Sequence, residues 1–66
     1  MYANLMGQKA YHKLTDDDMA RILGISRNAY AQKAKSGRFY PEECKKLCEY
    51  FGKSFGYLFA RDDELK

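Results

Sequence analysis

The sequence predicts an all-α fold, a compact bundle of about five short helices. Three observations support this fold class. Helix start and stop signals recur at short intervals along the 66-residue chain, apolar residues in its second half repeat with the period of a helix, and no segment alternates as a half-buried strand does. One domain is expected over residues 1–60, followed by a polar C-terminal tail over residues 61–66.

The first two predicted helices precede the first glycine turn. Residues 2–12 lack proline and carry scattered apolar residues, which favours a helix. The second helix is expected to begin after Thr15, because Thr15 and Asp18 match a capping box and the acidic residues 16–18 suit the positive end of a helix dipole. Gly24 is expected to end it in a left-handed conformation, which glycine adopts without steric penalty.

The third predicted helix carries a concentrated positive charge. Ser26 is a favourable N-cap, and the helix is expected to run to about Lys35, with Ser36 and Gly37 as its stop. The net charge of the whole chain is only +3, which by itself does not indicate a nucleic-acid partner. Residues 26–38, however, contain four basic side chains and no acidic one. Both a solvated helix face and a nucleic-acid-binding face fit this pattern.

The fourth and fifth predicted helices complete the core. Pro41 favours the first turn of a helix that Gly52 closes. Residues at the i, i+3, i+4, i+7 spacing form its buried face: Cys44, Leu47, Cys48 and Phe51. Ser54 is expected to cap a last short helix, and three apolar residues should fold back from it onto the core: Phe55, Leu58 and Phe59.

The second and third predicted helices fit a helix-turn-helix. Ala20 is small enough to allow the close approach of two helices, and Gly24 provides the sharp turn four residues later. The inward side of the pair is expected to share one core, formed by Met19, Leu23, Ile25 and Tyr30. A pair of crossed helices of this kind can present its second helix to DNA.

At these positions the chain resembles the lambda-repressor-like family, the Cro and repressor type of helix-turn-helix regulators from phages and bacteria. The matching residues extend over most of the chain: Leu14-Thr15, Met19-Ala20, Leu23-Gly24-Ile25-Ser26, Ser36-Gly37, Pro41-Glu42-Glu43 and Tyr57-Leu58-Phe59. The resemblance implies an all-helical domain that binds double-stranded operator DNA as a homodimer and regulates transcription as a repressor or Cro-like protein. It also implies a prokaryotic or phage-encoded protein at the nucleoid.

The resemblance places a recognition helix, residues 26–35, in the major groove. Arg27 can donate a bidentate pair to guanine O6 and N7, and Asn28 or Gln32 can pair in the same way with adenine N6 and N7. Ala31 is short enough to let the helix enter the groove, where its methyl group can touch a thymine methyl. These four residues are the expected base contacts, and a solvated polar surface is the alternative.

Four residues are expected to contact the DNA backbone: Ser26, Lys33, Lys35 and Arg38. Lys35 and Arg38 lie near the end of the helix, where phosphate contacts give affinity without sequence information. The family often has an apolar residue at the position of Lys33. The stem of this lysine can therefore also cover the core while its ammonium reaches the backbone.

Asp16 departs from the family pattern, which commonly has Gln at the first residue of this helix as a donor to phosphate. A carboxylate repels phosphate, and residues 16–18 place three negative charges together. Two interpretations remain open. The helix docks on DNA more weakly or at a different angle, or Asp16 pairs with a neighbouring basic residue such as Lys13.

A homodimer is expected because one module of this size buries only about 600–1,000 Å² against DNA. The aromatic residues near the last helix exceed what a small core absorbs, so Phe55 and Tyr57 are the candidate interface residues. The alternative function is a protein-interaction module of the same fold, an antitoxin-like or antirepressor-like subunit with weak or no DNA binding. The acidic residues 16–18 would suit that role.

Other function classes find little support. No apolar run approaches the roughly 20 residues of a membrane span, and the N-terminus lacks the layout of a signal peptide, so we expect a cytoplasmic protein without a membrane partner. His12 is the only histidine, and Cys44 and Cys48 suit one buried helix face. Neither a catalytic nor a metal site is therefore expected. No cofactor and no small-molecule ligand are expected.

Overall fold

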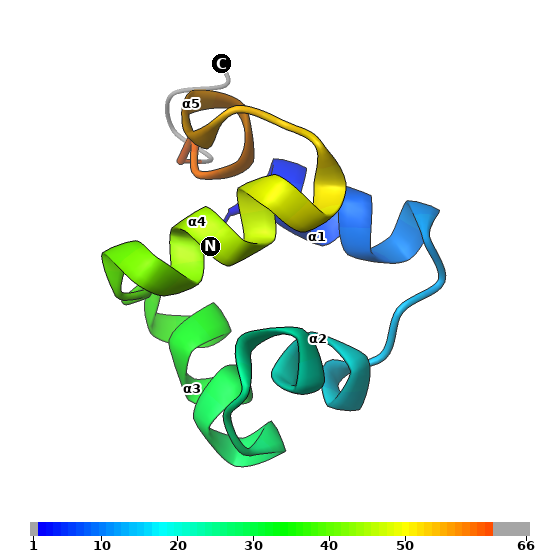
Figure 1. The fold of residues 1–66 in the computed structure, drawn as a ribbon, viewed down its shortest axis with the longest axis vertical. Coiled ribbons are helices and arrows are strands. Elements are labelled where there is room, and N and C mark those ends of the chain that lie inside the picture. The colour runs from blue at the N-terminus through cyan, green and yellow to red at the C-terminus, as the bar shows by residue number, and fades with distance from the viewer. Residues whose placement is uncertain (1, 62–66) are drawn as a thin grey trace.

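Five helices surround one core in the computed structural model, which describes residues 2–61 (Figure 1). They are α1 (Ala3–Tyr11), α2 (Asp16–Leu23), α3 (Arg27–Ser36), α4 (Pro41–Phe51) and α5 (Phe55–Leu58). No strand occurs within the described residues, so the predicted all-α fold class is confirmed. Apart from Arg61, the polar tail predicted over residues 61–66 lies outside the described residues.

Local capping sets the ends of α2 and the start of α3. Thr15 Oγ1 accepts a hydrogen bond from Asp18 N at 3.2 Å, and Asp18 Oδ2 accepts one from Thr15 N at 2.9 Å. The backbone bond from Thr15, and then the bond from its side chain, lower the pKa of Asp18. Gly24 ends α2 with a φ of 72°, and Ser26 Oγ accepts from Ala29 N at 3.1 Å. The predicted capping box, left-handed turn and N-cap are confirmed.

Buried side chains from all five helices form the core: Leu5, Met19, Ala20, Leu23, Tyr30, Cys44, Leu47, Phe51, Leu58 and Phe59. Helix α2 packs against α3 and α4, while α5 packs against α1 and α4. Two aromatic residues that the sequence did not identify, Tyr2 and Phe39, pack against this core. The hydroxyl of Tyr2 also donates to the carbonyl oxygen of Gly37 at 2.8 Å, which fastens the start of the chain to the end of α3.

Tyr30 projects from α3 into the core and fixes the inner side of that helix. It is 1% exposed, and its hydroxyl has no hydrogen-bond partner among residues 2–61. Burial, with a smaller contribution from the negative charge of Asp16, raises the pKa of Tyr30 to about 12.

This pKa predicts a loss of stability in strong alkali. A free tyrosine ionises near pH 10.0, so above that pH the unfolded chain releases a proton that the folded chain retains until about pH 12. The free energy of unfolding should therefore fall over this interval, and Tyr30→Phe should remove this part of the dependence. Denaturant titrations of both proteins from neutral to alkaline pH measure the effect. Identical pH dependence of the two proteins would contradict the prediction.

Candidate nucleic-acid interface

The outward side of α3 brings the predicted base-contact residues together. Arg27, Asn28, Ala31 and Gln32 are all exposed. With Lys35 they occupy positions i, i+1, i+4, i+5 and i+8, which lie on one side of an α-helix. The buried ring of Tyr30 holds the opposite side against the core.

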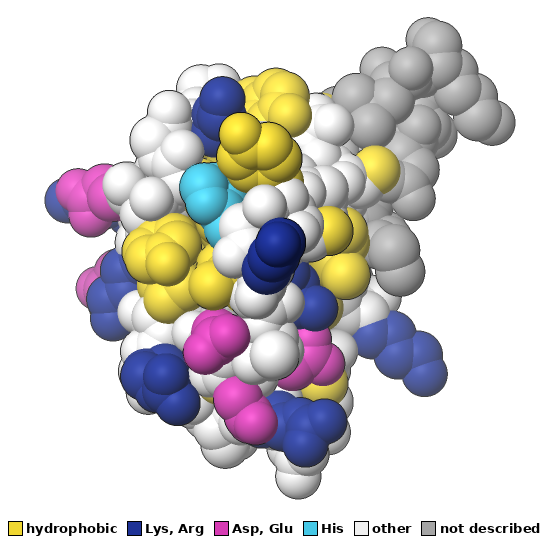
Figure 2. Space-filling view, turned by 90° about the vertical axis from the view of Figure 1, so that its right-hand side faces the viewer, with side chains coloured by type: hydrophobic (Ala, Val, Ile, Leu, Met, Phe, Trp, Pro, Cys, Tyr) yellow, Lys and Arg dark blue, Asp and Glu magenta, His cyan; other side chains and the backbone are white. Residues whose placement is uncertain are grey.

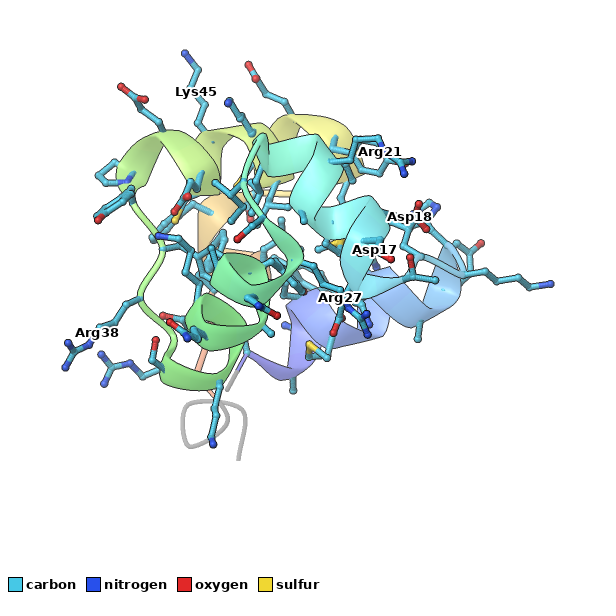
Figure 3. The ribbon with its side chains drawn as sticks, turned by 90° about the horizontal axis from the view of Figure 1, so that it is seen from below. Asp17, Asp18, Arg21, Arg27, Arg38 and Lys45 are labelled. Atoms are coloured by element: carbon cyan, nitrogen blue, oxygen red, sulfur yellow. The ribbon has the colours of Figure 1, made fainter. Side chains whose placement is uncertain are left out.

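Positive side chains stand at both ends of this surface. Figure 3 shows Arg27 at the start of α3 and Arg38 beyond its end. Lys35 and Arg38 are exposed and lie near the helix C-terminus, where the helix dipole favours positive charge. The turn between them is closed by Gly37, with a φ of 76°, and by a 3.3 Å bond from Arg38 N to Ser36 Oγ.

Lys33 is placed differently from the other residues predicted to contact the DNA backbone. Its Nζ lies 3.2 Å from Glu43 Oε1 and 3.9 Å from the centre of the Tyr40 ring. The Lys33 side chain is only 17% exposed. The same oxygen of Glu43 accepts a hydrogen bond from Tyr40 N at 2.8 Å. This arrangement argues against the predicted phosphate contact of Lys33, because its charge is neutralised within the protein.

The buried carboxylate of Glu43 was not identified from the sequence. Its position, three residues after Tyr40, is the one from which a glutamate accepts the N-cap backbone N–H, which is one half of a capping box. The contact with Lys33, in contrast, joins α3 to α4 and depends on how the two helices cross. Glu43 therefore fixes the end of the candidate recognition helix relative to the rest of the core.

Two of the three carboxylates in the first turn of α2 pair with basic residues outside α3. Asp16 Oδ1 lies 3.0 Å from Lys9 Nζ of α1, so its partner is Lys9 rather than the nearer neighbour Lys13. Asp18 belongs to the capping box, and its second oxygen, Oδ1, lies 3.5 Å from Arg21 Nη1.

The third carboxylate contacts the candidate interface directly. Asp17 Oδ1 lies 3.9 Å from Arg27 Nε, and the two side chains are 63% and 67% exposed. Figure 3 shows the pair where the first turn of α2 lies beside the start of α3. The residue predicted to read guanine is thus held next to a negative charge.

Phe55 and Tyr57, the predicted dimer contacts, are exposed on α5. Phe55 is 61% exposed and Tyr57 is 42% exposed. The expectation that Phe55 folds back onto the core with Leu58 and Phe59 is therefore wrong for Phe55. The ring of Phe55 stacks on the buried ring of Phe59 at a centroid distance of 5.1 Å, and Asn4 Nδ2 donates to the carbonyl oxygen of Tyr57 at 2.9 Å. Both aromatic side chains are therefore accessible, while α5 itself is held to α1.

A second aromatic surface lies around His12, and Figure 2 shows hydrophobic side chains beside the histidine. Tyr11 is 78% exposed and Tyr50 is 52% exposed. The ring of His12 lies 5.1 Å from that of Tyr11 and 5.5 Å from that of Phe51. An open groove of about 290 Å³ is lined by Leu14, Asp18, Arg21, Ile22 and Tyr50. This groove could not be predicted from the sequence, because its lining combines residues 14–22 with Tyr50 of α4.

The two cysteines, the possible metal ligands and the helix lengths bear on catalytic, metal and membrane sites. Burial raises the pKa of both Cys44 and Cys48, which disfavours the reactive thiolate form. Within residues 2–61, no group of three or more histidine, cysteine, aspartate or glutamate side chains could hold a metal ion. None of the five helices described above is both long and apolar enough to cross a membrane.

No protein-family model matches the chain, and neither a curated protein nor a solved structure matches it. The resemblance to the lambda-repressor-like family therefore stays a prediction from the residues. The geometry of α3 and its surroundings has to carry the functional conclusion.

Proposed function

We propose that the protein binds double-stranded DNA sequence-specifically, as a lambda-repressor-like transcriptional regulator that places α3 in the major groove. The observation that carries the proposal is the outward side of α3. There, exposed hydrogen-bonding side chains lie between cationic residues on a helix whose inner side is fixed by a buried tyrosine. A prokaryotic or phage-encoded regulator acting at the nucleoid is part of this proposal.

The spacing along α3 suits the width of the major groove. Arg27, Ala31 and Lys35 follow each other at intervals of four residues and form one stripe along the helix. The eight steps from Arg27 to Lys35 span about 12 Å, since each step along the helix adds about 1.5 Å. The groove is also about 12 Å wide. A small alanine at the centre allows close approach of the helix, while Arg27 and Lys35 reach towards its two ends.

Base recognition is assigned to the first two turns of α3. Arg27 supplies the donors for guanine, and Asn28 and Gln32 each supply a donor and an acceptor that match adenine. Ser26 is exposed, and its oxygen already accepts from Ala29 N, so its hydroxyl hydrogen is the group available to a phosphate. Lys35 and Arg38 contribute phosphate contacts at the other end.

Lys35 and Lys33 offer a matched pair of variants for the phosphate contacts. Lys35→Ala is expected to weaken binding to all duplexes alike and to lower the slope of log affinity against log salt by about 0.9, because one phosphate contact is lost. Lys33→Met removes the same charge from the same helix. Because that charge is bound to Glu43, its loss should leave the slope unchanged in a variant whose circular dichroism shows that the fold is kept. Fluorescence anisotropy titrations over a series of salt concentrations measure both slopes, and equal reductions would contradict the assignment.

A homodimer through α5 completes the proposal. Two copies can occupy half-sites about 34 Å apart, one helical turn of DNA, which doubles the contact area of a single small module. The exposed aromatic side chains of Phe55 and Tyr57 are proposed as the two-fold contact. A stoichiometry of one chain per bound duplex would contradict this part of the proposal.

Binding of the chain to its own promoter region and to a random duplex, measured against salt concentration, tests the proposal as a whole. We expect tighter binding to the promoter and a steep loss of affinity for both duplexes as salt increases. Absence of salt-dependent binding to either duplex would contradict it.

One observation favours a second function, a protein-interaction module of the same fold. The aromatic surface around Tyr11 and Tyr50, together with the adjacent groove, offers apolar contact area apart from α3. This function predicts no salt-dependent binding to DNA, so the same titrations distinguish the two.

A further inference from the structure

We propose that Asp17 is a specificity-determining residue of the DNA interface, which acts by holding the guanidinium group of Arg27. This inference rests on the proposed DNA-binding function. Asp17 is not expected to contact DNA itself. Its role is to weaken the binding of Arg27 to phosphate more than the binding of Arg27 to guanine.

The nitrogen of Arg27 that faces Asp17 determines which donors of the guanidinium group stay available to DNA. Asp17 Oδ1 faces Nε of Arg27 at 3.9 Å, the nitrogen nearest the aliphatic stem. Within residues 2–61, Arg27 forms no ion pair with any other residue. An arginine donates from a rigid planar fork, so a carboxylate held at Nε leaves a pair of donors for the guanine acceptors O6 and N7.

Asp17 differs from its two neighbours in exposure as well as in partner. Its side chain is 63% exposed, against 39% for Asp16 and 35% for Asp18. Asp16 is bound to Lys9, and Asp18 caps its own helix. Asp17 is therefore the carboxylate of this turn that is both open to solvent and paired with the outward side of α3.

An acidic residue at this place suits the positive end of the α2 dipole, but folding stability does not explain its pairing with Arg27. An exposed ion pair at such a distance contributes little to stability. Arg27 stands at the first residue of α3, where the helix dipole disfavours a positive charge. A nearby carboxylate offsets that unfavourable field and favours positions of the Arg27 guanidinium close to Asp17.

The pair acts differently on the two kinds of duplex. On a random sequence, Arg27 has only phosphate to bind. Asp17 competes for the guanidinium and repels the phosphate, so this contact is weakened. On a cognate sequence, guanine takes the terminal nitrogens while Nε keeps its carboxylate, so the arginine is already oriented for the base. Asp17 therefore lowers non-specific affinity more than specific affinity.

The variant Asp17→Asn tests this role while leaving the Thr15 capping box in place. We expect affinity for a random duplex to rise about two- to fivefold, the range that an exposed ion pair represents. Affinity for a duplex selected for tight binding should change less than about twofold. The salt slope on the random duplex should steepen by about 0.9, because Arg27 gains a phosphate. Circular dichroism of the variant checks that the fold is kept.

Two controls separate this role from a general loss of negative charge. Asp16→Asn removes the same charge one residue earlier, from the partner of Lys9, and should shift both affinities by the same factor. In a chain that already carries Arg27→Ala, Asp17→Asn should no longer change the ratio of the two affinities.

The possible outcomes distinguish the inference from the function on which it rests. If Asp17→Asn shifts both affinities equally while the unaltered chain binds DNA in a salt-dependent way, the role of Asp17 is overturned and the proposed function stands. If the unaltered chain shows no such binding, the proposed function fails and the inference fails with it. A change in the ratio that persists without Arg27 would also overturn the inference, because the effect would not pass through that arginine.

Discussion

Arg27→Ala is expected to weaken binding to the selected duplex by about 1–3 kcal/mol, the discrimination that one bidentate arginine–guanine pair provides. The preference at a single base pair should be lost, while the rest of the site is still read. The side chain is 67% exposed and forms a single weak ion pair with Asp17, so its removal should change the stability of the fold little.

Arg21→Ala is the matched control for Arg27. Arg21 is also exposed and also pairs with an aspartate of α2, at 3.5 Å, yet it does not lie on α3. The two variants lose the same charge, so a general electrostatic effect on DNA would be similar in both. The comparison measures the affinity of each variant for the selected duplex and for copies of that duplex with one altered base pair. An equal loss for Arg27→Ala on selected and random duplexes would remove Arg27 from the base-reading residues.

Ala20→Leu is expected to lower the free energy of unfolding by about 1–3 kcal/mol through overpacking. Ala20 is 4% exposed in the core, where α2 packs against α3 and α4. A larger side chain at this position has to displace a neighbouring helix. In a domain of this size, 1 kcal/mol corresponds to about 4–8 °C in melting temperature.

Ala31→Leu is the matched control, because it makes the same chemical change on the exposed side of α3. It should leave the melting temperature nearly unchanged and weaken DNA binding, since the larger side chain keeps the helix out of the groove. Thermal melts and duplex titrations on both variants measure the two effects. An unchanged melting temperature for Ala20→Leu would contradict the packing described for the helix pair, and unchanged DNA binding for Ala31→Leu would contradict the docking of α3.

Local signals allowed most helix ends to be predicted from the sequence. Capping by Thr15 and Ser26, and the left-handed turns at Gly24 and Gly37, depend on residues within four positions of each other. The first helix has no such side-chain cap. Its observed bounds, Ala3–Tyr11, lie one residue inside the predicted range at each end.

Interactions between helices could not be predicted in the same way. Three ion pairs depend on how two helices cross: Asp16 with Lys9, Asp17 with Arg27, and Glu43 with Lys33. From the sequence alone, a basic residue close to the acid along the chain is an equally good candidate for its ion-pair partner, as Lys13 is for Asp16. The sequence thus indicated the exposed side of α3, whereas the arrangement of charge around it required the three-dimensional fold.

Selection of duplexes from a random pool by the unaltered chain tests the proposed function most directly. We predict the enrichment of one sequence composed of two inverted half-sites whose centres lie about 10 bp apart, bound by two chains, with a guanine in each half-site whose preference disappears in Arg27→Ala. Two results would contradict the proposal that this helix reads DNA. One is a pool that shows no enriched sequence after selection, and the other is an enriched sequence that stays the same whichever exposed residue of α3 is substituted.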